Sequence, residues 1–223
     1  MTSEQQPDSP SLIVTDLDGT LFQSRGVVTH RTISVLRRCL DSGLSVAIAT
    51  ARPYLSVFHL LDQRLHSGLF WVCSNGAAVY RDHRLISETP LTPEEAQSVL
   101  SRLYSSPNEY VVSLEAAGKL YIDKFVRHDP VPYEVADLLE IAKGPVTKIL
   151  VSLAGGQPGL VSLPDLPTGV AVMTAGGGAY TSILSPEATK ESGIEAVLSE
   201  LQIDWPNVMA FGDDLNDLGM LAA

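Results

Sequence analysis

Short apolar runs alternate with helical segments at both ends of this chain. The runs are rich in β-branched residues, as expected of parallel strands that are covered on both faces. Candidate strands lie at 11–16, 44–50, 69–77 and within 207–214. Candidate helices lie at 30–42, 187–201 and 216–223, and a hairpin at 77–87. Strands that alternate with helices predict an α/β fold with an open parallel sheet.

The middle of the chain has a different pattern. Expected helices at 92–104 and 132–142 are interspersed with expected strands at 109–116, 119–125, 146–153, 169–175 and 179–185. This pattern predicts a second, α+β domain, inserted at 83–180 between the two parts of the parallel-sheet domain, 1–82 and 181–223. The Gly-rich stretches at 153–159 and 174–180 lack the P-loop pattern and a following helix, which favours turns.

Composition narrows the class of protein. The chain has 223 residues, 45% of them hydrophobic, and a formal net charge of −11. That charge would repel nucleic acid and anionic lipid, so neither is expected as a partner, and an anionic substrate would need local positive charge. Cys39 and Cys73 show no metal-ligand spacing, and residues 1–10 form a polar stretch unlike a signal peptide. A cytoplasmic protein with buried thiols is expected, whereas the oligomeric state is left open.

Polar residues stand where the expected core strands end. They are Asp16 and Asp18, Thr50 and Arg52, Ser74 and Asn75, and the group Asp213, Asp214, Asn216 and Asp217. The carboxyl ends of parallel strands meet at one edge of a sheet, which is where ligands collect. A single acid there can simply cap the next helix, but several converging carboxylates repel one another unless a cation lies among them. Oxygen ligands without His or Cys favour Mg²⁺.

Four of these features stand in the order of a known family. The segment "DLDGTL", the threonine of "ATAR", Lys190 and the segment "GDDLND" resemble the four motifs of the haloacid dehalogenase superfamily of phosphatases. With "SNGA" and the long insertion, the chain is most similar to the Cof-type branch, whose α+β cap is of type IIB. The resemblance spans the whole chain and implies a Rossmann-like core with an inserted cap domain.

The resemblance also implies roles for individual residues. Asp16 would be the nucleophile that forms an aspartyl-phosphate, and Asp18 the general acid and base. Thr50 would bind a phosphoryl oxygen, Lys190 would neutralise charge, and Asn216 matches a position that contacts the phosphoryl group. The Mg²⁺ ligands would be Asp16, the backbone carbonyl of Asp18, Asp213 and, in support, Asp217. Asn75 is a further candidate for substrate binding, and Arg52 is either a substrate contact or part of a structural salt bridge.

The chain departs from the family pattern at two places. Glu191 follows the third-motif lysine where the family usually has glycine, which adds a negative charge near the expected site. Relatives generally continue beyond the fourth motif with a further strand and helices, whereas this sequence stops at Ala223.

The expected function is Mg²⁺-dependent hydrolysis of small phosphorylated metabolites, with sugar phosphates as the first choice of substrate. A phosphomannomutase-like mutase is one alternative, although such enzymes carry an extra Gly-Gly that "GDDLND" lacks. A binding module without turnover is the other. The cap is expected to select the substrate, with Glu115, Lys119, Tyr121 and Lys124 as polar candidates.

Overall fold

The structure is a computed structural model, and it describes residues 10–22, 28–125, 131–153, 161–175 and 180–223. The chain divides into two units. Unit 1 comprises Met1–Arg52, Leu60–Ser87 and Thr189–Ala223, and unit 2 comprises Pro53–His59 and Glu88–Ala188. Both Gly-rich stretches, for which turns were expected, fall largely outside the described residues. Among the described residues, no helix has the length and apolar character needed to cross a bilayer.

Unit 1 is built on a six-stranded sheet in the order β12-β1-β2-β3-β4-β5. The strands are β1 (Leu12–Asp16), β2 (Ser45–Ala49), β3 (Leu69–Cys73), β4 (Ala78–Arg81), β5 (Arg84–Glu88) and β12 (Val208–Phe211). β12, β1, β2 and β3 run parallel, and β4 turns back antiparallel to β3. The predicted α/β fold with a parallel sheet is therefore confirmed.

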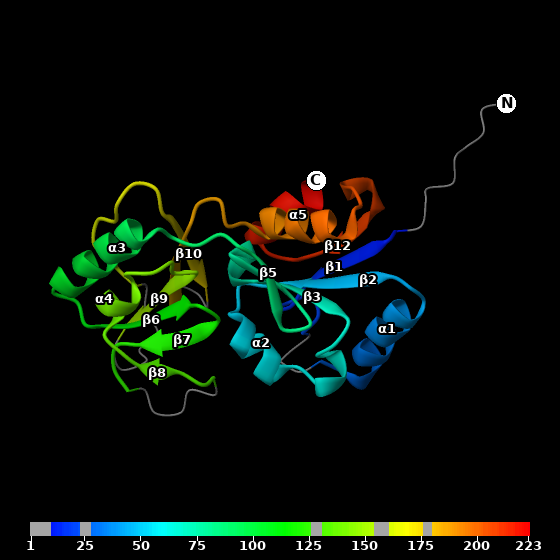
Figure 1. Cartoon of the computed structure of the whole chain (residues 1–223), viewed down its shortest axis with the longest axis horizontal. Helices are drawn as coiled ribbons and strands as arrows, with labels where there is room; N and C mark the ends of the chain where they lie inside the picture. Colours follow the sequence, from blue (N-terminus) through cyan, green and yellow to red (C-terminus); the bar gives the residue numbers. More distant parts are fainter. Residues whose placement is uncertain (1–9, 23–27, 126–130, 154–160, 176–179) are drawn as a thin grey trace. The chain divides into compact units, whose positions relative to one another are not determined.

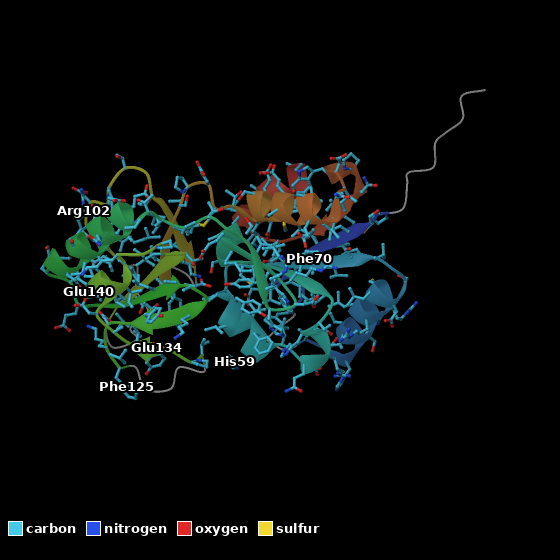
Figure 2. All side chains as sticks on the ribbon, viewed as in Figure 1. His59, Phe70, Arg102, Phe125, Glu134 and Glu140 are labelled. Atoms are coloured by element: carbon cyan, nitrogen blue, oxygen red, sulfur yellow. The ribbon has the colours of Figure 1, made fainter. Side chains whose placement is uncertain are left out.

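Helices cover both faces of this sheet, as Figure 1 shows for α1 and α5. They are α1 (His30–Asp41), α5 (Lys190–Leu201) and the short α6 (Leu218–Ala222). On one face, Leu12 and Val14 of β1 pack in a buried cluster with Ile194 and Val197 of α5. Phe70, labelled in Figure 2, belongs to the same cluster, and the guanidinium carbon of Arg81 lies 4.9 Å from the centre of its ring.

Unit 2 is an α+β unit around a second six-stranded sheet, in the order β10-β11-β9-β6-β7-β8. Its strands are β6 (Tyr110–Ala116), β7 (Lys119–Ile122), β8 (Glu134–Val135), β9 (Lys148–Leu153), β10 (Ala171–Ala175) and β11 (Tyr180–Leu184). All pairs are antiparallel except β7 with β8. Leu100 and Leu103 of α3 (Pro93–Ser105) and Leu138 of α4 (Leu138–Ile141) join the buried core of this unit. The helix α2 (Tyr54–Leu60) begins within the segment Pro53–His59.

The unit boundaries differ from those expected at 82/83 and 180/181. Each strand belongs to the unit of the sheet to which it is hydrogen-bonded: β5 lies beside β4 in unit 1, and β11 pairs with β9 and β10 in unit 2. The helix expected at 132–142 is wrong in its first half. Glu134 and Val135 form a parallel pair with β7, and the helix begins only after Asp137, whose side chain accepts a hydrogen bond from the Leu139 N–H.

Candidate active site

The strand-end residues gather at the carboxyl edge of the unit 1 sheet. β1 ends at Asp16, Thr50 follows β2, the turn Ser74–Gly76 follows β3, and Asp213 lies just beyond β12. The hydrogen bonding of β2 and β3 continues past the strands, because the Thr50 N–H donates to Val72 and the Asn75 N–H donates to Thr50. This continuation brings Thr50 and Asn75 next to each other.

The centre of the site is a buried ion cluster of one lysine and two aspartates. Lys190 Nζ donates to Asp16 Oδ1 at 2.5 Å and to Asp217 Oδ1 at 2.6 Å. All three residues are nearly inaccessible to solvent, with exposed fractions of 2% for Lys190, 4% for Asp16 and 0% for Asp217. A buried charge is costly unless it is paired, so each member of this cluster depends on the others.

Asp16 has one oxygen held and the other open. Its Oδ2 is buried and has no hydrogen-bond partner among the described residues. Burial raises the pKa of the Asp16 carboxyl above its usual value, while the hydrogen bond and charge of Lys190 oppose that rise. A buried carboxylate oxygen without a partner is expensive in a folded protein, which points to a ligand at this position.

Lys190 is placed by a close approach between α5 and the turn after β3. The side chain of Thr189 caps α5 by accepting from the Ser192 N–H, so Lys190 is its first residue. Ser74, Asn75 and Gly76 all have positive φ. A side chain at Gly76 would overlap the carbonyl of Thr189, and one at Gly193 would lie 2.8 Å from the Gly76 Cα. Glycine at both positions therefore lets the helix start against the sheet edge.

Glu191 is not one of the ion-pair partners of Lys190, which are Asp16 and Asp217. Its carboxylate lies against α6, where a Cβ placed on Gly219 would be 2.7 Å from Glu191 Oε2. Glycine at 219 thus provides the space for the glutamate that follows the lysine in this chain.

The "GDDLND" loop is organised by Asp217. Asp217 Oδ2 accepts hydrogen bonds from the backbone N–H groups of Asp213 and Asp214, both at 3.0 Å. Asp214 has the capping role that a lone strand-end acid can have, since its Oδ1 accepts from the Leu215 N–H. Asp213 is exposed and accepts a hydrogen bond of 2.7 Å from the hydroxyl of Thr20. Thr20 was not among the predicted site residues, although it stands in "DLDGTL".

Asp18 and Arg52 form a two-bond ion pair at the exposed side of the site. Arg52 Nε donates to Asp18 Oδ2 at 2.6 Å, and Arg52 Nη2 donates to Asp18 Oδ1 at 2.8 Å. Of the two options left open for Arg52, the structure shows the salt bridge, and its partner is the residue expected to act as acid and base.

Three polar residues surround the carboxylates. Thr50 is buried, and its hydroxyl accepts from the Arg52 N–H at 3.1 Å. Asn75 is buried, and its Oδ1 accepts from Asn216 Nδ2 at 3.2 Å. The other amide atom, Asn216 Oδ1, is buried without a partner among the described residues. The turn after β3 and the fourth-motif loop are thereby joined by an amide pair.

The carboxylates fit a divalent metal ion. Asp16, Asp213 and Asp217 each have an oxygen within 4.8 Å of the others. The donors are carboxylate oxygens only, and the buried ammonium group of Lys190 pairs with just two of the three carboxylates, Asp16 and Asp217. An oxygen-only set with excess negative charge suits Mg²⁺.

The comparisons with known proteins agree with this architecture. The sequence profile of the haloacid dehalogenase-like hydrolases matches residues 13–223. An HMP-PP phosphatase of Enterobacter sp. (strain 638) is 26% identical over 93% of this chain and 79% of its own length. The 5-amino-6-(5-phospho-D-ribitylamino)uracil phosphatase YitU of Bacillus subtilis (strain 168) is also 26% identical, over 95% of this chain and 83% of its own.

Solved structures share the fold. A haloacid dehalogenase-like hydrolase from Bacteroides thetaiotaomicron aligns with a TM-score of 0.76 at 20% identity, covering 95% of this chain and 85% of its own. A subclass IIB sugar phosphatase of the same superfamily, BT4131, aligns with a TM-score of 0.69 at 19% identity, covering 95% and 84%. With the profile match over nearly the whole sequence, these findings confirm the predicted family. The chain belongs to the haloacid dehalogenase-like hydrolases and is an enzyme of their phosphatase branch.

Proposed function

We propose that this enzyme hydrolyses phosphomonoesters of small metabolites, sugar phosphates foremost, through an aspartyl-phosphate on Asp16. The main support is the environment of Asp16, which has one oxygen held by Lys190 and a second, buried oxygen without a partner among the described residues. A carboxylate so held is oriented and poorly solvated, and both properties favour nucleophilic attack. The relatives named as phosphatases of small phosphorylated compounds support the substrate class.

In the first half-reaction, Asp16 Oδ2 forms a bond to phosphorus and the bond from phosphorus to the leaving oxygen breaks. The leaving oxygen keeps the electron pair of that bond and takes a proton from the carboxyl group of Asp18. In the second half-reaction, Asp18 accepts a proton from water as the water oxygen attacks phosphorus. The bond between phosphorus and Asp16 then breaks, which restores the Asp16 carboxylate and releases phosphate.

The remaining residues would position the phosphoryl group and stabilise its charge. Thr50 would donate its hydroxyl to one phosphoryl oxygen, and Asn216 would donate from its amide nitrogen to another, supported by Asn75. Lys190 already lies on Asp16 and would stabilise charge in a loose, metaphosphate-like transition state. Mg²⁺ would be held by Asp16, Asp213 and the Asp18 carbonyl, with Asp217 in support, and would reduce the repulsion between Asp16 and the phosphate dianion.

Release of free phosphate from a panel of sugar phosphates, nucleotides and aryl phosphates tests this function. We expect phosphate release from several small esters and none from phosphoproteins. Conversion of a sugar 1-phosphate to the 6-phosphate without free phosphate would instead identify a mutase. Binding of the esters without turnover would identify a module that has lost activity.

The first prediction concerns the metal ion. EDTA should abolish phosphate release, Mg²⁺ should restore it, and Ca²⁺ should inhibit, because the larger ion takes more ligands at longer distances and draws Asp16 out of its line of attack. Initial rates at fixed substrate, after EDTA treatment and readdition of each ion, measure the effect. Equal rates with and without EDTA would contradict a metal-dependent mechanism.

We further propose that unit 2 is a type IIB cap that selects the organic part of the substrate. All nine predicted site residues lie in unit 1, so the phosphoryl-handling groups are separate in sequence from unit 2. Of the four polar candidates in unit 2, Glu115 is almost fully buried, Tyr121 packs against the hydrophobic core of the unit, and Lys119 pairs with Glu134 at 2.8 Å. The fourth candidate, Lys124, is exposed, and these observations single out none of the four as the substrate contact.

The second prediction tests that role. Replacing 88–188 by a short Gly-Ser linker should preserve hydrolysis of a small aryl phosphate and flatten the ranking of sugar phosphates. The ranking should flatten because the groups left in unit 1 would contact only the phosphoryl moiety common to all substrates. Relative kcat/KM values across the panel measure the effect. A folded variant that keeps the parent ranking would locate substrate choice in unit 1.

We also propose a cytoplasmic address. Cys73 is fully buried in β3 and Cys39 is partly buried in α1, as expected for structural thiols in a reducing compartment.

A further inference from the structure

We infer that Arg52 is a positioning residue for the general acid, acting on catalysis through Asp18 and not through the substrate. This inference rests on the proposed function and adds to it a role for a residue that sequence reasoning left between two options. Two structural features support it: the ion pair between Arg52 and Asp18, and the contacts that hold Arg52 in place.

Arg52 and Asp18 form a bidentate ion pair. Arg52 Nε and Nη2 reach the two oxygens of Asp18 separately, at 2.6 and 2.8 Å. A two-bond pair of this kind defines the plane and direction of a carboxylate, which a single lysine contact does not. The side chains are 35% exposed for Arg52 and 47% for Asp18, so the pair lies where solvent and a leaving group can reach it.

Arg52 is fixed on both its main chain and its side chain. Its N–H donates to the Thr50 hydroxyl at 3.1 Å, and its carbonyl accepts from the Ser74 N–H at 2.9 Å. Its guanidinium carbon lies 6.0 Å from the centre of the Phe22 ring, and Phe22 is 97% buried and donates its N–H to the Leu17 carbonyl. The arginine therefore ties the loop that carries Asp18 to the ends of β2 and β3.

The contacts of Arg52 favour a role in orienting Asp18 over a role in binding phosphate. Lys190 already provides a cation at Asp16. The Nε and Nη2 groups of Arg52 donate to the Asp18 carboxylate. A general acid must deliver its proton along a narrow direction, and small displacements of such a group are costly to the rate. Holding the Asp18 loop in place until the leaving oxygen arrives is the contribution we assign to Arg52.

The test separates substrates by how much their leaving group needs a proton. Nitrophenyl phosphate loses a stable phenolate, whereas glycerol phosphate must lose a poor alkoxide that requires the acid. In Arg52→Ala, kcat/KM for glycerol phosphate should fall about 10- to 100-fold, and kcat/KM for nitrophenyl phosphate should change less than about threefold. The ratio kcat/KM is the correct quantity, because it reports the steps up to release of the alcohol and omits the second half-reaction, which is common to both substrates.

Two further variants make the test decisive. In an Asp18→Asn background, Arg52→Ala should add little further loss with glycerol phosphate, since a residue that acts through Asp18 has no effect once the acid is gone. Arg64→Ala is the matched control, because Arg64 forms the same two-bond pair with Asp62, at 2.8 Å for both bonds, and neither residue is among the predicted site residues. This control should leave kcat/KM unchanged for both substrates.

Three results would overturn the inference. An equal loss with both substrates would mean that Arg52 binds the phosphoryl group, and no loss with glycerol phosphate would reduce the pair to a surface salt bridge. Additive losses in the double variant would separate Arg52 from Asp18. Failure of the proposed function has a different signature, since the unchanged enzyme would then release no phosphate from either substrate. Retained hydrolysis of nitrophenyl phosphate by Arg52→Ala also shows that the variant is folded.

Discussion

Asp16→Asn should lower phosphate release by at least about a thousandfold while the protein stays folded. The amide has the shape of the carboxylate but cannot attack phosphorus, and loss of a covalent nucleophile typically costs several orders of magnitude. The fold should survive, because the amide oxygen can still accept from Lys190 and burial already disfavours the charged form of Asp16. Phosphate release and thermal unfolding, measured on the same preparation, give both quantities.

Asp204→Asn is the matched control for this variant. It makes the same chemical change at an exposed residue whose side chain makes no capping hydrogen bond. Phosphate release and the midpoint temperature of thermal unfolding should therefore both stay at the wild-type values. If Asp16→Asn retained more than about a hundredth of the activity, Asp16 would not be the nucleophile. A large drop in the midpoint would instead show that the carboxylate is needed for folding.

Lys190→Met should both destabilise the protein and stop turnover. The lysine is the cation bonded to Asp16 and Asp217, and all three side chains are buried. Removing one partner of a buried ion pair leaves uncompensated charge and typically costs about 3–5 kcal/mol of unfolding free energy. Chemical denaturation at neutral pH measures the loss, and phosphate release should fall with it because the transition state loses its cation.

Lys143→Met is the control for this change. Lys143 bonds Glu140 at 2.6 Å, the same length as one of the buried contacts, but both side chains are more than half exposed. Its loss should change the unfolding free energy by less than about 0.5 kcal/mol. Adding Asp217→Asn to Lys190→Met should recover part of the stability, because it removes one of the two orphaned charges. If both lysine variants lost the same stability, burial would not be what makes the Lys190 cluster costly to break.

Much of unit 1 could be predicted because its signals are local. The strands expected at 11–16, 44–50 and 69–77 each contain an apolar run with strand propensity, and the structure has β1, β2 and β3 within them. The third was expected too long, because β3 ends at Cys73 and Ser74–Gly76 form a turn. Parallel strands place their carboxyl ends at one edge, so Asp16, Thr50 and Asp213 could be expected near one another without knowledge of a single contact.

Unit 2 was harder to predict because several of its signals conflict. The segment 132–142 has helical spacing, yet Glu134 and Val135 pair with β7 as an edge strand. This pairing gives their backbone N–H and C=O groups hydrogen bonds to a neighbouring strand, and a propensity summed over local residues does not include such bonds. The difference between the expected boundaries and the two units has the same origin: β5 and β11 are ordinary strands in sequence, and only the sheet to which each is hydrogen-bonded decides its unit.

The sequence by itself determined the family, the parallel sheet and the set of polar residues at its edge, because strand propensity and motif order are written in consecutive residues. Only the tertiary structure decided which side chains contact one another in the site. That Lys190 joins Asp16 to Asp217, that Arg52 holds Asp18, and that Thr20 binds Asp213 are contacts between residues 27 to 193 positions apart. Such contacts depend on side-chain direction and on the close approach of α5 at Gly76 and Gly193, which arise only when the sheet, its turns and its helices are packed together.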